Sequence, residues 1–335
     1  MQDCNSDRPL DRFVELYEAL NKDRSWWGDV NSLRFAAITA LHCPGSGLEV
    51  ATAIRDVAED LRQRASWFTQ LRGPLNFVIS AMLLRMGDTP EAFLAEADRV
   101  QSMFRQLGMR RGYIYEMLAI LVLRQRGKGA PITREMTTRF QKLYEEMKCH
   151  HWWLTGPDDF PACAVLVQEE GSAAEIGETI EGIYQALAGQ GFSTGNQLQF
   201  AANMLYLAHQ DPTLIAQRYR ALADAFRAKD VSIWRSDYDE LAFLSFLKQS
   251  PEEVVSRTLQ HRKAMAQLKP KPDVFMTFSL AAAITFIELV TMDDKMQVIT
   301  EARPLMDMQT IIAAQEAVAV IAAVSGAAAA GAASG

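Results

Sequence analysis

Apolar residues recur every three or four positions through most of the chain. Between residues 93 and 107 the spacing is four, three, four and three, at Phe93, Ala97, Val100, Phe104 and Leu107. An α-helix has 3.6 residues per turn, so all five side chains fall on one side of a helix. The same spacing begins at five other places: Val50, Met136, Ile176, Ile215 and Val254. The sequence therefore predicts six helices that are apolar along one side, which we call the outer helices.

The starting positions of these six helices are separated by 43, 43, 40, 39 and 39 residues, which is an internal repeat. A second set of helices lies between them and is apolar around most of its circumference, as in residues 115–123 and 280–289. Such helices must pack on several sides, so we call them the inner helices. Each can be aligned on a large apolar residue: Phe35, Phe77, Met117, Phe160, Phe200, Leu241 and Phe278.

Turn residues separate four of the inner helices from the outer helices that follow. The signals are Gly87-Asp88-Thr89-Pro90, Gly171-Ser172, Asp211-Pro212 and Ser250-Pro251. Each offers a side-chain oxygen that can cap a helix, and proline is favoured in the first helical turn. Ser172 with Glu175, and Ser250 with Glu253, have the spacing of a capping box.

A repeat of about 40 residues built from paired helices predicts an all-α fold, because one pair cannot bury its apolar face alone. We expect a right-handed α-α superhelix, or α-solenoid, of about seven two-helix repeats. Residues 1–304 would form this single domain, with an extra helix near 9–22. Residues 305–335 would form a capping helix and a flexible Ala/Gly-rich tail, although a membrane-peripheral or oligomerising role for that helix is an alternative.

A polar residue precedes each inner-helix anchor, and we call this set the polar ladder: Arg34, Asn76, Glu116, Asp159, Gln199, Glu240 and Thr277. In a stack of parallel helices these positions would line one wall, and solenoids bind partners on their concave surfaces. The ladder therefore suggests a groove for an extended peptide or a basic partner. The alternative is that these residues cap and solvate the first turns of the helices.

The densest group of reactive side chains lies between Cys149 and Cys163. His150, His151, Asp158 and Asp159 could form a metal site or an acid-base pair. Their spacing matches neither HExxH nor paired CxxC motifs, and Asp158 and Asp159 are also well placed to stabilise a helix start. Both interpretations stay open at this stage.

All six tryptophans fall seven to ten residues before an inner-helix anchor: Trp26, Trp27, Trp67, Trp152, Trp153 and Trp234. A recurring aromatic residue at a helix entrance favours a packing role, in which each ring fills the joint between two repeats. An interaction hot spot is the alternative.

Charge, composition and motifs limit the kinds of partner, location and chemistry that we expect. The 335 residues carry a formal net charge of −7, which argues against a nucleic-acid partner. The four cysteines fit no disulfide framework, and residues 1–13 contain no secretory signal, so we expect a cytoplasmic protein. The 311–335 stretch is too rich in alanine and glycine to predict a membrane span. No nucleotide-binding or nucleophile motif occurs, so we predict neither catalytic residues nor a cofactor.

Two segments carry a family resemblance: residues 151–161, HWWLTGPDDFP, and residues 191–200, GFSTGNQLQF. Together they resemble the bacterial family known as domain of unknown function 4003. The resemblance implies a bacterial protein and transfers no catalytic residue. It draws attention to seven positions, two of which belong to the polar ladder: Thr155, Asp158, Asp159, Pro161, Gly195, Asn196 and Gln199.

We therefore predict a non-enzymatic helical-repeat scaffold that binds a protein or an extended peptide along its inner helices. The residues expected to contact the partner are Asn76, Glu116, Thr155, Asp158, Asp159, Asn196, Gln199 and Glu240. The alternative is a metal-binding protein or hydrolase centred on residues 149–163, with His150, His151, Asp158 and Asp159 as ligands.

Overall fold

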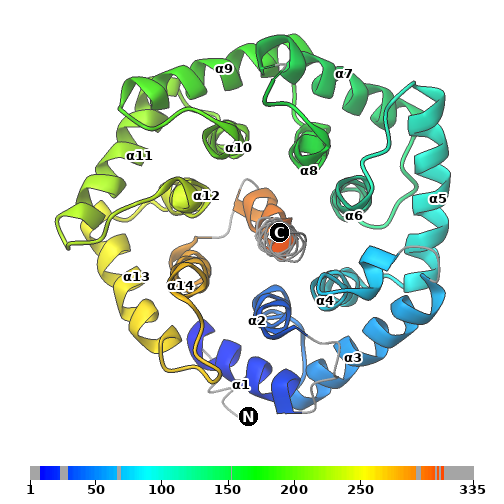
Figure 1. Ribbon diagram of the computed structural model, residues 1–335, viewed down its shortest axis with the longest axis horizontal. Helices are drawn as coiled ribbons and strands as arrows, with labels where there is room; N and C mark the ends of the chain where they lie inside the picture. The colour runs from blue at the N-terminus through cyan, green and yellow to red at the C-terminus, as the bar shows by residue number, and fades with distance from the viewer. Residues whose placement is uncertain are drawn as a thin grey trace, which may run out of the picture.

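The computed structural model of the chain describes residues 8–22, 29–65, 69–151, 153–291, 296–305, 308 and 311–312. Its helices are arranged in two concentric rings (Figure 1). The outer ring contains α1 (Pro9–Lys22), α3 (Gly47–Arg64), α5 (Pro90–Gln106), α7 (Arg134–His151), α9 (Ala173–Gly189), α11 (Pro212–Arg227) and α13 (Pro251–Met265). The inner ring contains α2 (Val30–Thr39), α4 (Asn76–Met86), α6 (Ile114–Arg126), α8 (Phe160–Leu166), α10 (Asn196–Leu205), α12 (Tyr238–Ser245) and α14 (Val274–Leu289). The described residues contain no β-strand, so the prediction of an all-α fold is confirmed.

Apolar patterning accounts for the two rings. Helix α5 buries one side, through Phe93, Ala97, Val100 and Phe104, as the spacing predicted. By contrast, every residue of α14 from Met276 to Phe286 is buried. A helix that is apolar all round is stable only when it is enclosed, which is the position of the inner ring.

The inner helices run parallel, because neighbouring helices meet start to start and end to end. At the ends of α6 and α8, Arg126 forms an ion pair with Glu169 at 2.9 Å. At the starts of α8 and α10, the Gln199 amide donates a hydrogen bond to the Thr155 hydroxyl at 3.3 Å. We call the side on which the inner helices begin the start face, and the side on which they finish the end face.

Contacts between the first and last helices close the ring. The Tyr17 hydroxyl of α1 donates a hydrogen bond to the Lys269 carbonyl at 2.8 Å, and the Arg34 guanidinium of α2 donates to the Pro270 carbonyl. Both carbonyls belong to the loop that leads into α14, which packs against α1 and α2 (Figure 1). The sequence did not predict this closure, and a right-handed solenoid of about seven repeats stays a prediction.

Side-chain caps begin the outer helices at the predicted residues. Ser172 and Glu175 form a complete capping box at the start of α9. The side chains of Thr89, Asp211 and Ser250 each accept a hydrogen bond from a backbone N–H in the first turn that follows. These bonds satisfy N–H groups that have no partner within the helix.

Arginines on outer helices fix the turns of the next repeat. Arg139 of α7 donates hydrogen bonds to the carbonyls of Val167, Glu169 and Gly171, at 2.7, 2.6 and 2.8 Å. Arg218 of α11 does the same for the turn after α12. Each guanidinium thereby links one helical pair to the next through backbone atoms.

Residues 296–305 are helical and lie in the centre of the inner ring (Figure 1). Arg303 forms an ion pair with Glu240 of α12 at 2.6 Å, and both side chains are buried. Arg303 also donates a hydrogen bond to the Ser279 carbonyl of α14 at 3.4 Å, and Val298 faces the ends of α8 and α10 across a pocket. The predicted capping helix is thus helical in its described part but begins earlier than residue 305, and residues 313–335 lie outside the described residues.

Candidate functional site

Most residues of the predicted peptide groove are buried. Asn76, Glu116, Thr155, Asp159, Gln199 and Glu240 are at most 9% exposed. Of the predicted set, Asp158 is half-buried and Asn196 is exposed. The ladder therefore does not form the solvent-facing strip that we expected, because its side chains are enclosed by neighbouring helices and loops.

The buried ladder side chains form hydrogen bonds near the starts of the inner helices. Asn76 donates to the carbonyls of Ala58 and Leu71 at 3.1 and 2.8 Å. Glu116 accepts from the Gly112 N–H at 3.0 Å and also pairs with Arg105. These contacts agree with the alternative reading, in which ladder residues satisfy polar groups at helix entrances.

Asp159 accepts a hydrogen bond from the Gly156 N–H at 3.0 Å, just before α8. Burial, reinforced by the neighbouring Asp158 carboxylate, raises the pKa of Asp159 to about 8. The carboxyl is therefore mostly protonated at neutral pH, which makes it a poor ligand for a cation. The nearby Cys163 side chain is also buried, and burial raises the pKa of its thiol.

The histidines of the 149–163 cluster lie beside carboxylates of two helices, Glu146 of their own helix α7 and Glu181 of α9. His150 Nε2 lies 3.4 Å from Glu146, and His151 Nε2 lies 2.6 Å from Glu181. The His151 ring also packs against Tyr184, with 4.5 Å between ring centroids. No group of three or more metal-ligating side chains comes together among the described residues, so the alternative set His150, His151, Asp158 and Asp159 is not assembled there.

The two tryptophans among the described residues do not fill joints between repeats. Trp153 is 65% exposed and Trp234 is 70% exposed. Phe192, which occupies the corresponding place before α10, is buried against Tyr219 and Tyr238. The packing prediction is thus wrong for Trp153 and Trp234, while Trp26, Trp27, Trp67 and Trp152 lie outside the described residues.

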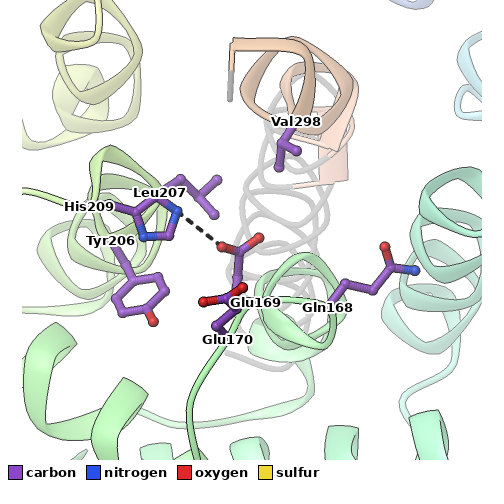
Figure 2. Close-up of a pocket in the computed structure, with 7 residues that line it drawn as sticks. All are labelled: Gln168, Glu169, Glu170, Tyr206, Leu207, His209 and Val298. Atoms are coloured by element: carbon purple, nitrogen blue, oxygen red, sulfur yellow. Dashed lines mark ion pairs between the residues drawn. The ribbon is translucent and has the colours of Figure 1, made fainter. Parts of the chain in front are cut away.

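A pocket of about 430 Å³ opens on the end face (Figure 2). It lies between the turn after α8, the short helix η3 (Tyr206–Ala208) that extends α10, and the central segment. Its lining residues are Gln168, Glu169, Glu170, Tyr206, Leu207, His209 and Val298. The lining combines carboxylates and other polar groups with an apolar wall, as binding pockets commonly do.

The Glu169 carboxylate organises this pocket. One oxygen pairs with Arg126, and the other lies 3.2 Å from His209 Nε2, the contact drawn in Figure 2. The Tyr206 ring packs edge-on against His209 at 5.6 Å, and burial together with Glu169 raises the pKa of its phenol. Glu170, on the rim, is exposed. Tyr206 and His209 are thus held in place while Glu170 is open to solvent.

Sequence reasoning missed this pocket. The sequence analysis singled out none of Glu169, Glu170 and His209 as site residues, although the first two follow α8 and the third follows η3. Position along the repeat could have indicated it, because three successive inner helices are each followed or ended by one of the residues that meet there: Arg126, Glu169 and His209. In a parallel ring, residues at equivalent ends become neighbours.

The fold and the site define a ring of helices with an apolar core, buried polar side chains near the helix starts, and an acidic pocket. The described residues contain no helix that is both long and apolar enough to cross a membrane. The chain belongs to the family described as protein of unknown function (DUF4003), which matches residues 16–317. It is 24% identical over 285 residues to the uncharacterized protein YeaA of Bacillus subtilis, covering 82% of each chain. No solved structure matches the chain.

Proposed function

We propose that the protein is a non-enzymatic cytoplasmic scaffold, built as a helical-repeat solenoid, that binds a protein through its end face. The observation that carries the proposal is the 430 Å³ pocket, whose rim carries the exposed carboxylate of Glu170. The partner segment would be basic. The buried polar ladder, including Asn76 and Glu240, would support the ring from within and would not contact this partner.

Charge on the end face supports a basic partner. The turns after the inner helices, and the first turns of the outer helices, expose many carboxylates: Glu49, Glu91, Glu135, Glu170, Glu175, Asp211, Glu252 and Glu253. Fewer cations are exposed in the same segments: Lys128, Arg134 and Lys248. Complementary charge increases association rates and selects against partners of like charge.

The pocket gives this acidic surface a place for one anchoring side chain. A lysine or arginine could lay its alkyl stem against Leu207 and Val298 while its charged group meets Glu170. Binding energy in protein interfaces is concentrated in a few such buried anchors. The proposed interface therefore needs the pocket and not only the surrounding charge.

The test is co-purification of partners from the native host with a charge-reversed pocket, Gln168→Lys with Glu170→Lys. We expect recovery of the partner to fall at least about tenfold, because the pocket would then repel a basic side chain. The matched control is Glu178→Lys with Gln185→Lys, the same exchange at exposed positions of α9. Equal recovery from both variants, with unchanged thermal stability, would refute the pocket as the binding site.

A further inference from the structure

The start face exposes large apolar side chains at separate places around the ring. Tyr113 is 63% exposed, Trp153 is 65%, Trp234 is 70% and Val274 is 74%. Each lies in the loop before an inner helix or at its first residue, before α6, α8, α12 and α14. Since the inner helices run parallel, all four lie on the same side of the molecule. Only Leu48 and Leu214 among large apolar residues of the described chain are comparably exposed elsewhere, at the starts of α3 and α11.

Cations flank three of these four apolar side chains. Arg110 and Arg111 precede Tyr113, Lys229 and Arg235 flank Trp234, and Lys269 and Lys271 precede Val274; all six are exposed. The exposed acids of these loops are Asp230 and Asp273, and Asp273 caps α14. A chain with a net charge of −7 therefore presents a cationic surface on this side.

Carboxyl groups beneath the start face cancel little of this charge. Burial raises the pKa of Asp159, next to α8, to about 8 and raises that of Asp239, in α12, well above its ordinary value. Glu240 is ionically paired with Arg303. These three carboxyl groups therefore offset little of the surface charge at neutral pH.

We propose that the start face docks on an anionic lipid membrane, with its aromatic side chains at the level of the lipid headgroups. Tryptophan and tyrosine favour the boundary between lipid and water, and nearby lysines and arginines are attracted to anionic lipids. The helices form a ring (Figure 1), and loops gathered on one side of a ring can meet a flat surface together.

A membrane fits this arrangement better than an acidic protein does. The apolar side chains come from four different loops, each before a different inner helix. A peptide bound as a helix or a strand would need anchors along one line. A lipid surface accepts separated contacts, and its affinity grows with the buried apolar area and the number of cations.

The test is co-sedimentation of the full chain with vesicles of phosphatidylcholine containing about one third phosphatidylserine. We expect the protein to pellet with these vesicles, to remain in solution with pure phosphatidylcholine, and to be released by high salt. Two variants should each partition at least about tenfold less: Trp153→Ser with Trp234→Ser, and Arg110→Glu with Arg111→Glu.

The control is Leu48→Ser with Leu214→Ser, which removes two apolar side chains of comparable exposure, 60% and 56%, from the opposite side. Its partitioning should match that of the unmodified protein, and all variants should melt at similar temperatures because the substituted residues are exposed. Failure of the unmodified protein to pellet, or an equal loss in the control, would overturn the proposal. If the protein did not bind vesicles but bound polyglutamate through the same residues, the start face would be a site for an acidic protein and the membrane proposal would be overturned.

Discussion

At the scale of single residues, the Asp159 carboxyl shows what burial of the polar ladder does to a charge. Its pKa is about 8 in the folded protein and close to the ordinary value of 3.8 in an unfolded chain. Folding therefore favours the protonated form. The resulting stability is fully present below about pH 4 and is lost as the pH rises towards 8.

We expect the variant Asp159→Asn to remove this pH dependence, because an amide cannot ionise and can still accept the Gly156 N–H. Between about pH 5 and pH 8 the unmodified protein should lose up to roughly 4 kcal/mol more unfolding free energy than the variant. Urea denaturation at both pH values measures the difference. Asp230→Asn, at an exposed position, serves as the control. If the unfolding free energies of Asp159→Asn and the unmodified protein changed in parallel with pH, Asp159 would not have a raised pKa in the folded protein.

At the scale of helices, the sequence predicted starts and faces well. Ser172, Thr89, Asp211 and Ser250 cap the helices where their side-chain chemistry indicated. The periodicity also separated one-sided from fully buried helices, because the apolar width of a helix reports how many sides are covered. Helix boundaries therefore follow from local chemistry in this chain.

Contacts between distant helices could not be predicted in the same way. A buried face indicates that a neighbour exists without saying which one, so neither the contact of α14 with α1 nor the central position of residues 296–305 was visible. A polar residue at a helix start gives the same sequence pattern whether it faces solvent or is covered by another helix. Asn76 and Gln199 are two such residues that turned out to be buried. Trp234 was misassigned for the converse reason, since an apolar residue in a loop can be exposed.

The buried pair of Glu240 and Arg303 attaches the central segment to α12. Arg303→Met leaves the Glu240 carboxylate buried without its cation, so we expect a loss of about 3–5 kcal/mol in unfolding free energy. Adding Glu240→Gln should recover part of that loss, because it removes the isolated charge. Chemical denaturation of the two single variants and the double variant measures this coupling.

The comparison for that pair is Arg64→Met, which breaks the surface contact with Asp60. An exposed ion pair contributes little, so this variant should lose less than about 1 kcal/mol. Similar losses for Arg64→Met and Arg303→Met would mean that the central segment is not held by the buried pair.

At the scale of the whole molecule, the parallel inner helices give the ring two different sides. Loops that enter these helices gather on the start face, where aromatic residues and cations are exposed. Turns that leave them gather on the end face, where carboxylates are exposed and the pocket opens. A scaffold attached to a membrane by the first side would present the second side to its partner, which joins the two proposals without making either depend on the other.

Closure of the ring couples segments that are far apart in the sequence. Tyr17→Phe with Arg34→Met removes the hydrogen bonds to Lys269 and Pro270. Each bond contributes about 1 kcal/mol, so local opening should become at least about fivefold more frequent. Hydrogen exchange should therefore accelerate in α1 and α2 and equally in α14, with α8, across the ring, unchanged (Figure 1).

Tyr184→Phe provides the matched comparison, since its hydroxyl accepts a hydrogen bond from the Gly195 N–H away from the closure. It should accelerate exchange only near α9 and α10. If Tyr17→Phe with Arg34→Met affected α1 and α2 while α14 kept its protection, the two ends would be opening independently, as they do in an open stack. Joint acceleration requires that the first and last helices support each other, because in a closed ring each is the other's neighbour.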